Sequence, residues 1–393
     1  MEEKIFSAGV DMIYLAACAL NDRLPDRDRL SSMNMTHVYK IAKLHSMQAM
    51  IYILLSKCQK EWGTPILDPE LDEKWAGSYR IVMNHLVKMD VEREALCRFL
   101  DENNIWYLCL KGVVMQGLYP MLGMRQMGDN DILVDPSGCD MIRDYMLSRG
   151  YEVDSYGKHC HDTYSKGKLH FEIHRMLFED TDKTRTAYDY YKSVEKKLLP
   201  GKGKSERLFR DEDFYVYMNF HAYKHFESAG CGVRMIMDNY VYMKAFGEKL
   251  DHKYLADEMA KLGITDYENS ALSLANAIFS PEAAESGDAV DRLSDSQRER
   301  LKYHVLSNTF GTRHNLIENK ITDMTGRSDV DRRGKARYLI SRFFPPREYY
   351  LDIHPVAGKY LIAIPFLWFI RLIRGVFRCK DVAEEVDFIK KMK

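Results

Sequence analysis

The chain has 393 residues, 46% of them hydrophobic, and its 57 Lys and Arg residues nearly balance its 58 Asp and Glu residues. This length predicts two or three domains, and the hydrophobic content excludes an intrinsically disordered chain. The balanced charge argues against a long nucleic acid as the main partner. The eight cysteines form no CxxC pair, and the N-terminus begins with acidic residues. We therefore expect a reduced, cytoplasmic protein.

The first 96 or so residues are predicted to be helical. Apolar residues recur at three-to-four spacing over 36–57 and over 75–100, as they do on one face of an amphipathic helix. The intervening segment 63–70 contains prolines and is predicted to be a loop.

Residues 103–180 are predicted to form a compact α+β unit. Strands are expected at 105–110, 131–134, 151–153, 161–165 and 169–174, with a turn at 166–168 making the last two a hairpin. Helices are expected at 113–119 and 137–149. Ser137 is predicted to cap the second helix, with Asp140 completing a capping box, and Gly150 to end it.

Helices are predicted again from about residue 211, strongly over 213–225 and 234–246, with a polar linker at 322–335 and a break at 344–346. We therefore predict a helical domain at 1–100, a core at 101–200, a second helical domain at 201–325 and a C-terminal amphipathic region at 326–393. The apolar run 360–370 is too short to span a bilayer, which takes about 20 residues. It is predicted to pack on the protein's own core; a weak contact with a membrane surface is the alternative.

Three acidic residues predict a metal site. Asp129 and Asp131 are two residues apart at the start of a predicted strand, so their side chains lie on the same face. Glu172 lies within the alternating strand 169–174, on the face opposite Phe171 and Ile173. If the two strands are neighbours, the three carboxylates supply the oxygen ligands that magnesium prefers. The alternative is an Asp-x-Asp turn with no metal.

Such a trio suits a two-ion site, in which metals stabilise the attacking and leaving oxygens of an in-line displacement. Asp129 and Asp131 would bind both ions. Glu172 would hold one of them and assist deprotonation of an acceptor hydroxyl.

These segments resemble a known family. Leu-Lys-Gly at 110–112, Tyr-Pro at 119–120, Arg125, the acidic string 129–134 and Phe-Glu-Ile-His at 171–174 are similar to the uncharacterised nucleotidyltransferase family of the polymerase-β superfamily. The resemblance implies a polymerase-β-like nucleotidyltransferase core, a small mixed sheet with helices, embedded in mainly helical domains. It also implies magnesium, two ions with manganese as an alternative, and a nucleoside triphosphate such as ATP as co-substrate. Asp129 and Asp131 match the family's metal-binding pair, and Glu172 matches its third carboxylate.

The predicted nucleotide-binding residues are Lys111, Gly112, Arg125, His174, His221 and His225. The superfamily's usual phosphate-gripping Gly-Ser pair is absent, and Lys111-Gly112-Val113 stands in its place. Gly112 still allows the backbone to approach a phosphate, Lys111 can add a charge, and the Arg125 fork suits phosphate oxygens.

Two other groups of residues are predicted to be structural. His159-Cys160-His161 has no matching ligand pair elsewhere in the sequence. Arg234 and Asp238 are spaced for an ion pair along one helix.

The predicted reaction is transfer of a nucleoside monophosphate from a nucleoside triphosphate to an acceptor hydroxyl, with release of pyrophosphate. The acceptor is left open among a small molecule, a sugar, a protein and an RNA end. Two alternatives remain: a non-catalytic nucleotide-binding or regulatory module with the same fold, and a peripheral membrane-associated scaffold.

Overall fold

The computed structural model describes residues 2–308, 311–312, 315–317, 319–320, 332–345, 350 and 360–376. The chain divides into two compact units. The first comprises Met1–Lys224 and Cys231–Thr309, and the second comprises His225–Gly230 and Phe310–Lys393. The four-part division predicted from the sequence stays a prediction.

The N-terminal quarter of the chain is helical, as predicted. Its helices are α1 (Glu2–Leu20), α2 (Arg27–Ser32), α3 (Met35–Leu44), α4 (Gln48–Trp62) and α5 (Pro69–Glu102). The helix predicted over 36–57 is in fact two helices, because Ser46 adopts a left-handed backbone with φ of 55° and ends α3. Asp68 caps α5 through the Leu71 amide, and Pro69 occupies its first turn.

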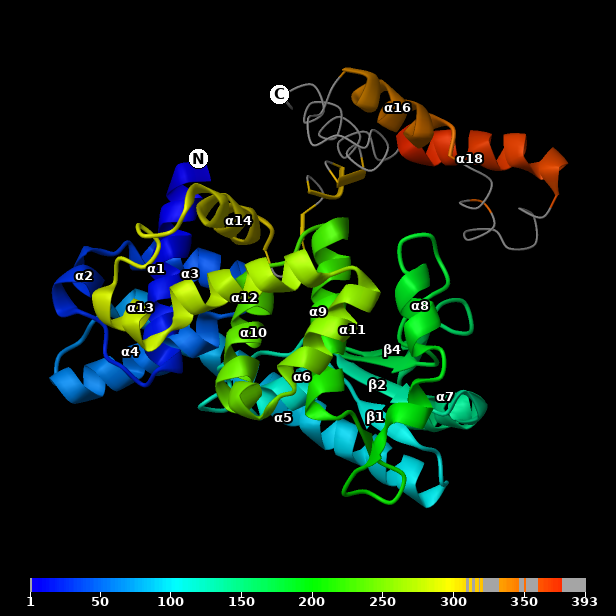
Figure 1. Ribbon diagram of the computed structural model, residues 1–393, viewed down its shortest axis with the longest axis horizontal. Coiled ribbons are helices and arrows are strands. Elements are labelled where there is room, and N and C mark those ends of the chain that lie inside the picture. Colours follow the sequence, from blue (N-terminus) through cyan, green and yellow to red (C-terminus); the bar gives the residue numbers. More distant parts are fainter. Residues whose placement is uncertain are drawn as a thin grey trace. The chain divides into compact units, whose positions relative to one another are not determined.

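A five-stranded mixed sheet follows α5. Its strands are β1 (Tyr107–Cys109), β2 (Asn130–Val134), β3 (Glu152–Ser155), β4 (His161–Lys166) and β5 (Leu169–His174), in the order β1-β2-β5-β4-β3. Strands β2 and β5 are parallel, and the other neighbours are antiparallel. This small mixed sheet among helices confirms the predicted α+β class (Figure 1).

One face of the sheet is buried against α5 and α7 (Cys139–Ser148). Ile132 and Val134 of β2 share this core with Phe171 and Ile173 of β5. Because strand side chains alternate, the residues between them lie on the opposite face. The alternation therefore separates the core from the face that carries the acidic residues.

Two short helices of the core begin at residues other than those predicted. Helix α6 (Lys111–Gln116) already includes Lys111 and Gly112. Before α7, Asp135 rather than Ser137 is the capping residue; its side chain accepts a hydrogen bond from the Ser137 amide at 2.9 Å and starts the 3-10 turn Pro136–Gly138. The chain reverses after α7 at Gly150, with φ of 80°, as predicted.

The rest of the first unit is mostly helical. It contains α8 (Arg185–Tyr191), the 3-10 turn Val194–Lys197, the short pair β6 (Leu199–Pro200) and β7 (Arg207–Leu208), α9 (Asp211–Ser228, whose last turn belongs to the second unit), α10 (Val233–Phe246), the 3-10 turn Gly247–Lys249, α11 (His252–Leu262), α12 (Thr265–Phe279), α13 (Pro281–Ser286) and α14 (Asp295–Leu306). Helix α1 contacts α3, α4, α12, α13 and α14, so N-terminal and later helices share one layer (Figure 1).

The second unit includes α16 (Arg332–Phe343), the 3-10 turn Leu361–Ala363 and α18 (Ile364–Val376). Of the predicted linker, residues 322–331 lie outside the described part of the chain, and the remainder begins α16. That helix ends just before the predicted break. Phe366 and Phe369 of α18 are exposed, whereas Leu367 is buried. Over the residues described, none of the helices combines the length and apolar character needed to cross a membrane.

Candidate active site

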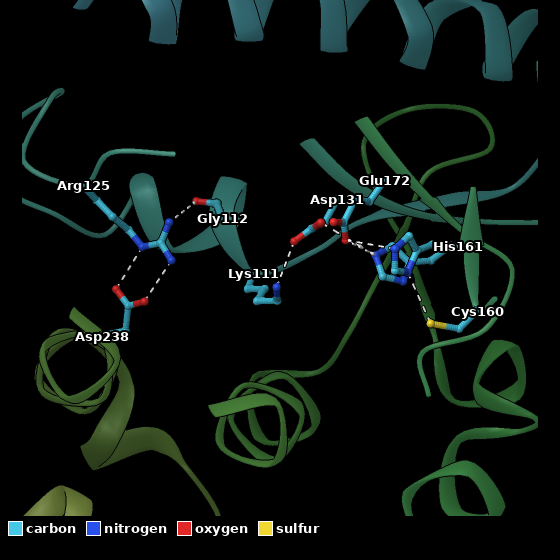
Figure 2. Close-up of polar contacts among 9 residues, drawn as sticks. Lys111, Gly112, Arg125, Asp131, Cys160, His161, Glu172 and Asp238 are labelled. Carbon is cyan, nitrogen blue, oxygen red and sulfur yellow. Dashed lines mark hydrogen bonds and ion pairs between the residues drawn. The ribbon is translucent and has the colours of Figure 1, made fainter. Parts of the chain in front are cut away.

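Two of the predicted carboxylates lie side by side. In the parallel pairing of β2 and β5, Asp131 is in register with Glu172, so both side chains leave the same face of the sheet. One carboxylate oxygen from each residue and one ring nitrogen of His174 all lie within 4.8 Å of one another. The structure therefore brings Asp131 and Glu172 (Figure 2) together with His174.

Asp131 is the buried centre of this group. Its Oδ2 accepts a hydrogen bond from the Lys111 ammonium at 2.9 Å, whereas its buried Oδ1 has no hydrogen-bond partner. Burial alone would raise the pKa of Asp131, but the charge of Lys111 and the neighbouring His174 hold it well below its usual range. Asp131 is therefore an ionised carboxylate with one oxygen unused.

Asp129 lies just before β2 and is not a member of the compact group. Burial, followed by the negative charge of Asp131, raises the pKa of the Asp129 carboxyl to about 6; Glu172 adds to this and Lys111 opposes it. Like charges crowded in this way favour uptake of either a proton or a cation.

His174 lies between the two carboxylates. Its Nε2 is 3.5 Å from Glu172 Oε2 and 3.7 Å from Asp131 Oδ1, and neither ring nitrogen makes a hydrogen bond of normal geometry. Burial would lower the pKa of His174, but its acidic neighbours, Asp131 first, raise it well above the usual value. The imidazole is thus held by charge rather than by well-formed hydrogen bonds.

The donor set fits a divalent cation. The unpartnered Oδ1 of Asp131 and the half-exposed carboxylate of Glu172 are hard oxygen ligands of the kind that magnesium takes. The imidazole of His174 additionally suits transition metals. The third carboxylate predicted from the sequence, Asp129, lies just before β2, and its role as a ligand stays a prediction.

The predicted phosphate-binding residues are already engaged within the chain. Lys111 pairs with Asp131, and Gly112 lies in the first turn of α6. The Arg125 fork is bidentate on the buried carboxylate of Asp238, with Nε and Nη2 each 2.9 Å from an oxygen. Arg125 Nη1 also lies 3.4 Å from the Gly112 carbonyl. The loop that carries Arg125 is therefore tied to α10 and to the start of α6 (Figure 2).

A model of the family described as "Uncharacterised nucleotidyltransferase" matches residues 31–280, well over half of the chain. The chain belongs to this nucleotidyltransferase family. The match includes the whole sheet, Asp129, Asp131 and Glu172, and the Arg125–Asp238 pair. The family assignment inferred from the sequence is confirmed.

Other comparisons add less. No curated protein matches the chain. Among solved structures, an antigenic nucleotidyltransferase-like protein from Paracoccidioides brasiliensis shares 16% sequence identity with this chain, and the match covers 47% of this chain and 93% of the other. The TM-score is 0.28.

Helix α9 carries both predicted helical histidines. His221 is buried, and its ring centre lies 6.3 Å from that of Tyr217 one turn earlier. His225 is half-buried. Their nucleotide-binding role stays a prediction.

Tyr217 is a site neighbour that sequence reasoning missed. Burial, followed by the negative charge of Asp131, raises the pKa of this tyrosine well above its usual value. Its hydroxyl is therefore a neutral group beside the acidic cluster. No local signal marked it, because a tyrosine on an aromatic-rich helix is usually a core residue.

The predicted ion pair between Arg234 and Asp238 is wrong. Arg234 instead donates from Nη1 to the Gln126 carbonyl at 2.9 Å, and Asp238 bonds Arg125 and the Tyr119 hydroxyl. The helical spacing was correct, but a residue 113 positions away provided the better-matched bidentate partner.

Proposed function

We propose that this protein transfers a nucleoside monophosphate from a nucleoside triphosphate to an acceptor hydroxyl in a magnesium-dependent reaction that releases pyrophosphate. The observation that carries the proposal is the alignment of Asp131 with Glu172 on adjacent parallel strands of a nucleotidyltransferase-family sheet. Ile132 next to Asp131, and Phe171 and Ile173 on either side of Glu172, are buried in the core, so the two carboxylates are held in place before any ligand binds.

Asp131, Glu172 and Asp129 are the residues that would hold the metal, with His174 beside them. When bound, magnesium supplies charge neutralisation for the triphosphate and for the attacking and leaving oxygens. Manganese would serve in the same position, because carboxylate ligands suit it as well as magnesium.

The chain's own residues supply positioning and proton transfer. Glu172 has a half-exposed carboxylate and accepts the proton of the acceptor hydroxyl. Lys111 is half-buried and pairs with Asp131 in the absence of nucleotide. In the complex, its ammonium turns to a phosphate oxygen, replacing part of the missing Gly-Ser grip. The acceptor stays open among a small molecule, a sugar, a protein and an RNA end.

The test compares wild type with Asp131→Asn, using labelled nucleoside triphosphates, magnesium and cell extract. Loss of label transfer and of pyrophosphate release is expected for Asp131→Asn but not for His170→Gln, whose side chain is exposed on the same sheet. Circular dichroism checks that both variants fold. Equal transfer by wild type and Asp131→Asn would overturn the proposal.

One observation favours a second candidate function, a nucleotide-binding module without turnover. The Lys111 ammonium neutralises Asp131 at 2.9 Å, as a permanent substitute for a metal would. Calorimetry with each nucleoside triphosphate and magnesium separates the two candidates. Binding without pyrophosphate release in the presence of extract supports the module, whereas release supports the transferase.

The exposed apolar side chains of α18 favour a weak contact with a membrane surface as an additional property. Co-sedimentation with anionic vesicles tests it: Phe366→Asp is expected to reduce binding, and equal sedimentation of the variant would exclude the contact.

A further inference from the structure

A second group of metal-ligand side chains adjoins the carboxylates. Cys160, His161 and His174 place one ligand atom each within 4.8 Å of the others. Cys160 and His161 come from the start of β4, and His174 ends β5. The sequence suggested no partner for Cys160 and His161; strand pairing supplies one.

The backbone fixes this arrangement. His161 and His174 are directly in register on antiparallel strands, and their ring centres are 4.9 Å apart. The Cys160 carbonyl accepts hydrogen bonds from the amides of Arg175 at 2.8 Å and Met176 at 3.3 Å, which extends the ladder past His174. The Cys160 amide donates to Glu179 Oε1 at 3.0 Å. The three side chains therefore start from rigid positions.

The two ring nitrogens of His161 and of His174 face different groups. The Nε2 atoms of His161 and His174 lie 3.8 Å and 3.5 Å from Glu172 Oε2. The Nδ1 of His161 lies 3.3 Å from the Cys160 sulfur, and the Nδ1 of His174 is buried without a hydrogen bond. Histidines that bind a metal commonly turn their other nitrogen to a carboxylate, which fixes the ring.

The donor chemistry selects the metal. A thiolate with two imidazoles prefers zinc or another thiophilic ion, whereas magnesium requires oxygen ligands. With zinc–sulfur bonds of about 2.3 Å and zinc–nitrogen bonds of about 2.0 Å, neighbouring donors lie roughly 3.3–3.6 Å apart. The sulfur–nitrogen separation of 3.3 Å in this group agrees with that spacing.

We propose that Cys160, His161 and His174 form a zinc site beside the magnesium-binding carboxylates. Zinc binding releases the thiol proton of Cys160 and leaves a fourth position open for water or substrate. It also holds the Nε2 side of His174 toward Asp131 and Glu172. The ion thus joins the ends of β4 and β5 and positions the carboxylates.

The experiment uses the full-length chain, expressed with zinc and dialysed against metal-free buffer containing magnesium. Elemental mass spectrometry is expected to find zinc retained in a one-to-one ratio. After replacement by cobalt, wild type is expected to show the near-ultraviolet charge-transfer absorption of a thiolate–cobalt bond. Cys160→Ser abolishes that absorption, and His161→Gln weakens zinc binding at least tenfold.

Two variants serve as controls. Cys139→Ser removes a buried thiol from the neighbouring core, and His170→Gln removes an exposed imidazole from β5. Both are expected to keep the metal.

No retained zinc in wild type, or equal zinc retention by Cys160→Ser and His161→Gln, would overturn the proposal. If those variants fail to fold by circular dichroism, the cobalt spectrum of wild type decides: a missing thiolate band excludes the site. Metal content is measured without nucleotide, so this outcome is independent of nucleotidyl transfer.

Discussion

Asp131 and Glu172 lie opposite each other in the parallel register of β2 and β5, although 41 positions separate them in the chain. Asp131 is buried with its charge shared between Lys111 and His174, whereas Glu172 is half-exposed. This difference in burial supports the roles proposed above, with Asp131 as a fixed metal ligand and Glu172 as the group nearer the acceptor.

Lys111 competes with a cation for Asp131. We predict that Lys111→Met strengthens magnesium binding in the absence of nucleotide and weakens nucleoside triphosphate binding about tenfold or more, because a charge-assisted hydrogen bond to phosphate is lost. Titration calorimetry measures both affinities. Lys168→Met, in the exposed hairpin turn, should leave both unchanged. Identical affinities in Lys111→Met and wild type would show that Lys111 has only a structural role.

A substitution at Gly112 tests whether the backbone at the start of α6 closely approaches a phosphate. A Cβ at this position would meet the flexible end of Met127 at 3.2 Å, so the neighbour can yield. We predict that Gly112→Ala changes the free energy of unfolding by less than about 1 kcal/mol but reduces nucleotide affinity. Gly117→Ala, in ordinary contact with the Val114 carbonyl, is the matched control for urea unfolding and nucleotide titration. Undiminished nucleotide affinity in Gly112→Ala would rule out close approach there.

The Arg125–Asp238 pair joins the site loop to α10 and is almost fully buried. Removing one partner leaves an uncompensated buried charge, so Arg125→Met should lower the free energy of unfolding by about 3–5 kcal/mol. Arg125→Lys should also destabilise the protein, because an ammonium cannot reproduce the two parallel bonds. Urea unfolding measures both. Glu70→Gln, which breaks the exposed Glu70–Lys74 pair, should have no measurable effect. A loss no larger for Arg125→Met than for Glu70→Gln would contradict this role.

Two buried histidines predict sensitivity to acid. Burial lowers the pKa of His45 to about 4, despite a hydrogen bond with the Val305 carbonyl, and Arg234 lowers it further. Burial likewise lowers the pKa of His304 to about 4, opposed by the Cys231 carbonyl and assisted by Arg300. Both rings are neutral in the folded protein, whereas in the unfolded chain they titrate near pH 6.5.

Because the unfolded chain takes up these protons first, the stability contribution of both histidines is complete above about pH 6.5 and falls as the pH drops toward about 4. Each proton contributes at most about 1.4 kcal/mol per pH unit. We predict that His45→Gln, which retains a donor for the Val305 carbonyl, reduces this slope in urea unfolding between pH 7 and pH 5. His37→Gln, on the exposed side of α3, serves as the comparison. An unchanged slope in His45→Gln would refute the assignment.

Local sequence determined a large part of this protein. Strict alternation along 169–174 places Phe171 and Ile173 in the core and Glu172 on the other face. Strand geometry also places Asp131 on the face opposite Ile132 and Val134, and the helices of the first hundred residues follow from their apolar spacing. These features depend on the geometry of one strand or one helix, which neighbouring residues set among themselves.

The turn before α7 shows why the capping-box spacing alone did not predict the capping residue. Ser137 and Asp140 have capping-box spacing, but Asp135 stands two residues earlier, before Pro136. Its carboxylate accepts a hydrogen bond from the Ser137 amide, so the turn begins earlier in the chain. The segment contains two possible capping residues, Asp135 and Ser137. The backbone conformation decided which of them caps the turn.

Only the tertiary structure decided which residues meet. It placed β5 beside β2 and the start of β4 beside His174, which joined Cys160 and His161 to the acidic group. It also paired Asp238 with Arg125, in a bidentate ion pair, instead of with Arg234. Strand order and buried ion pairs depend on which residues of the whole chain form the best hydrogen bonds and bury the most surface. A partner a hundred residues away therefore cannot be predicted from the local sequence pattern.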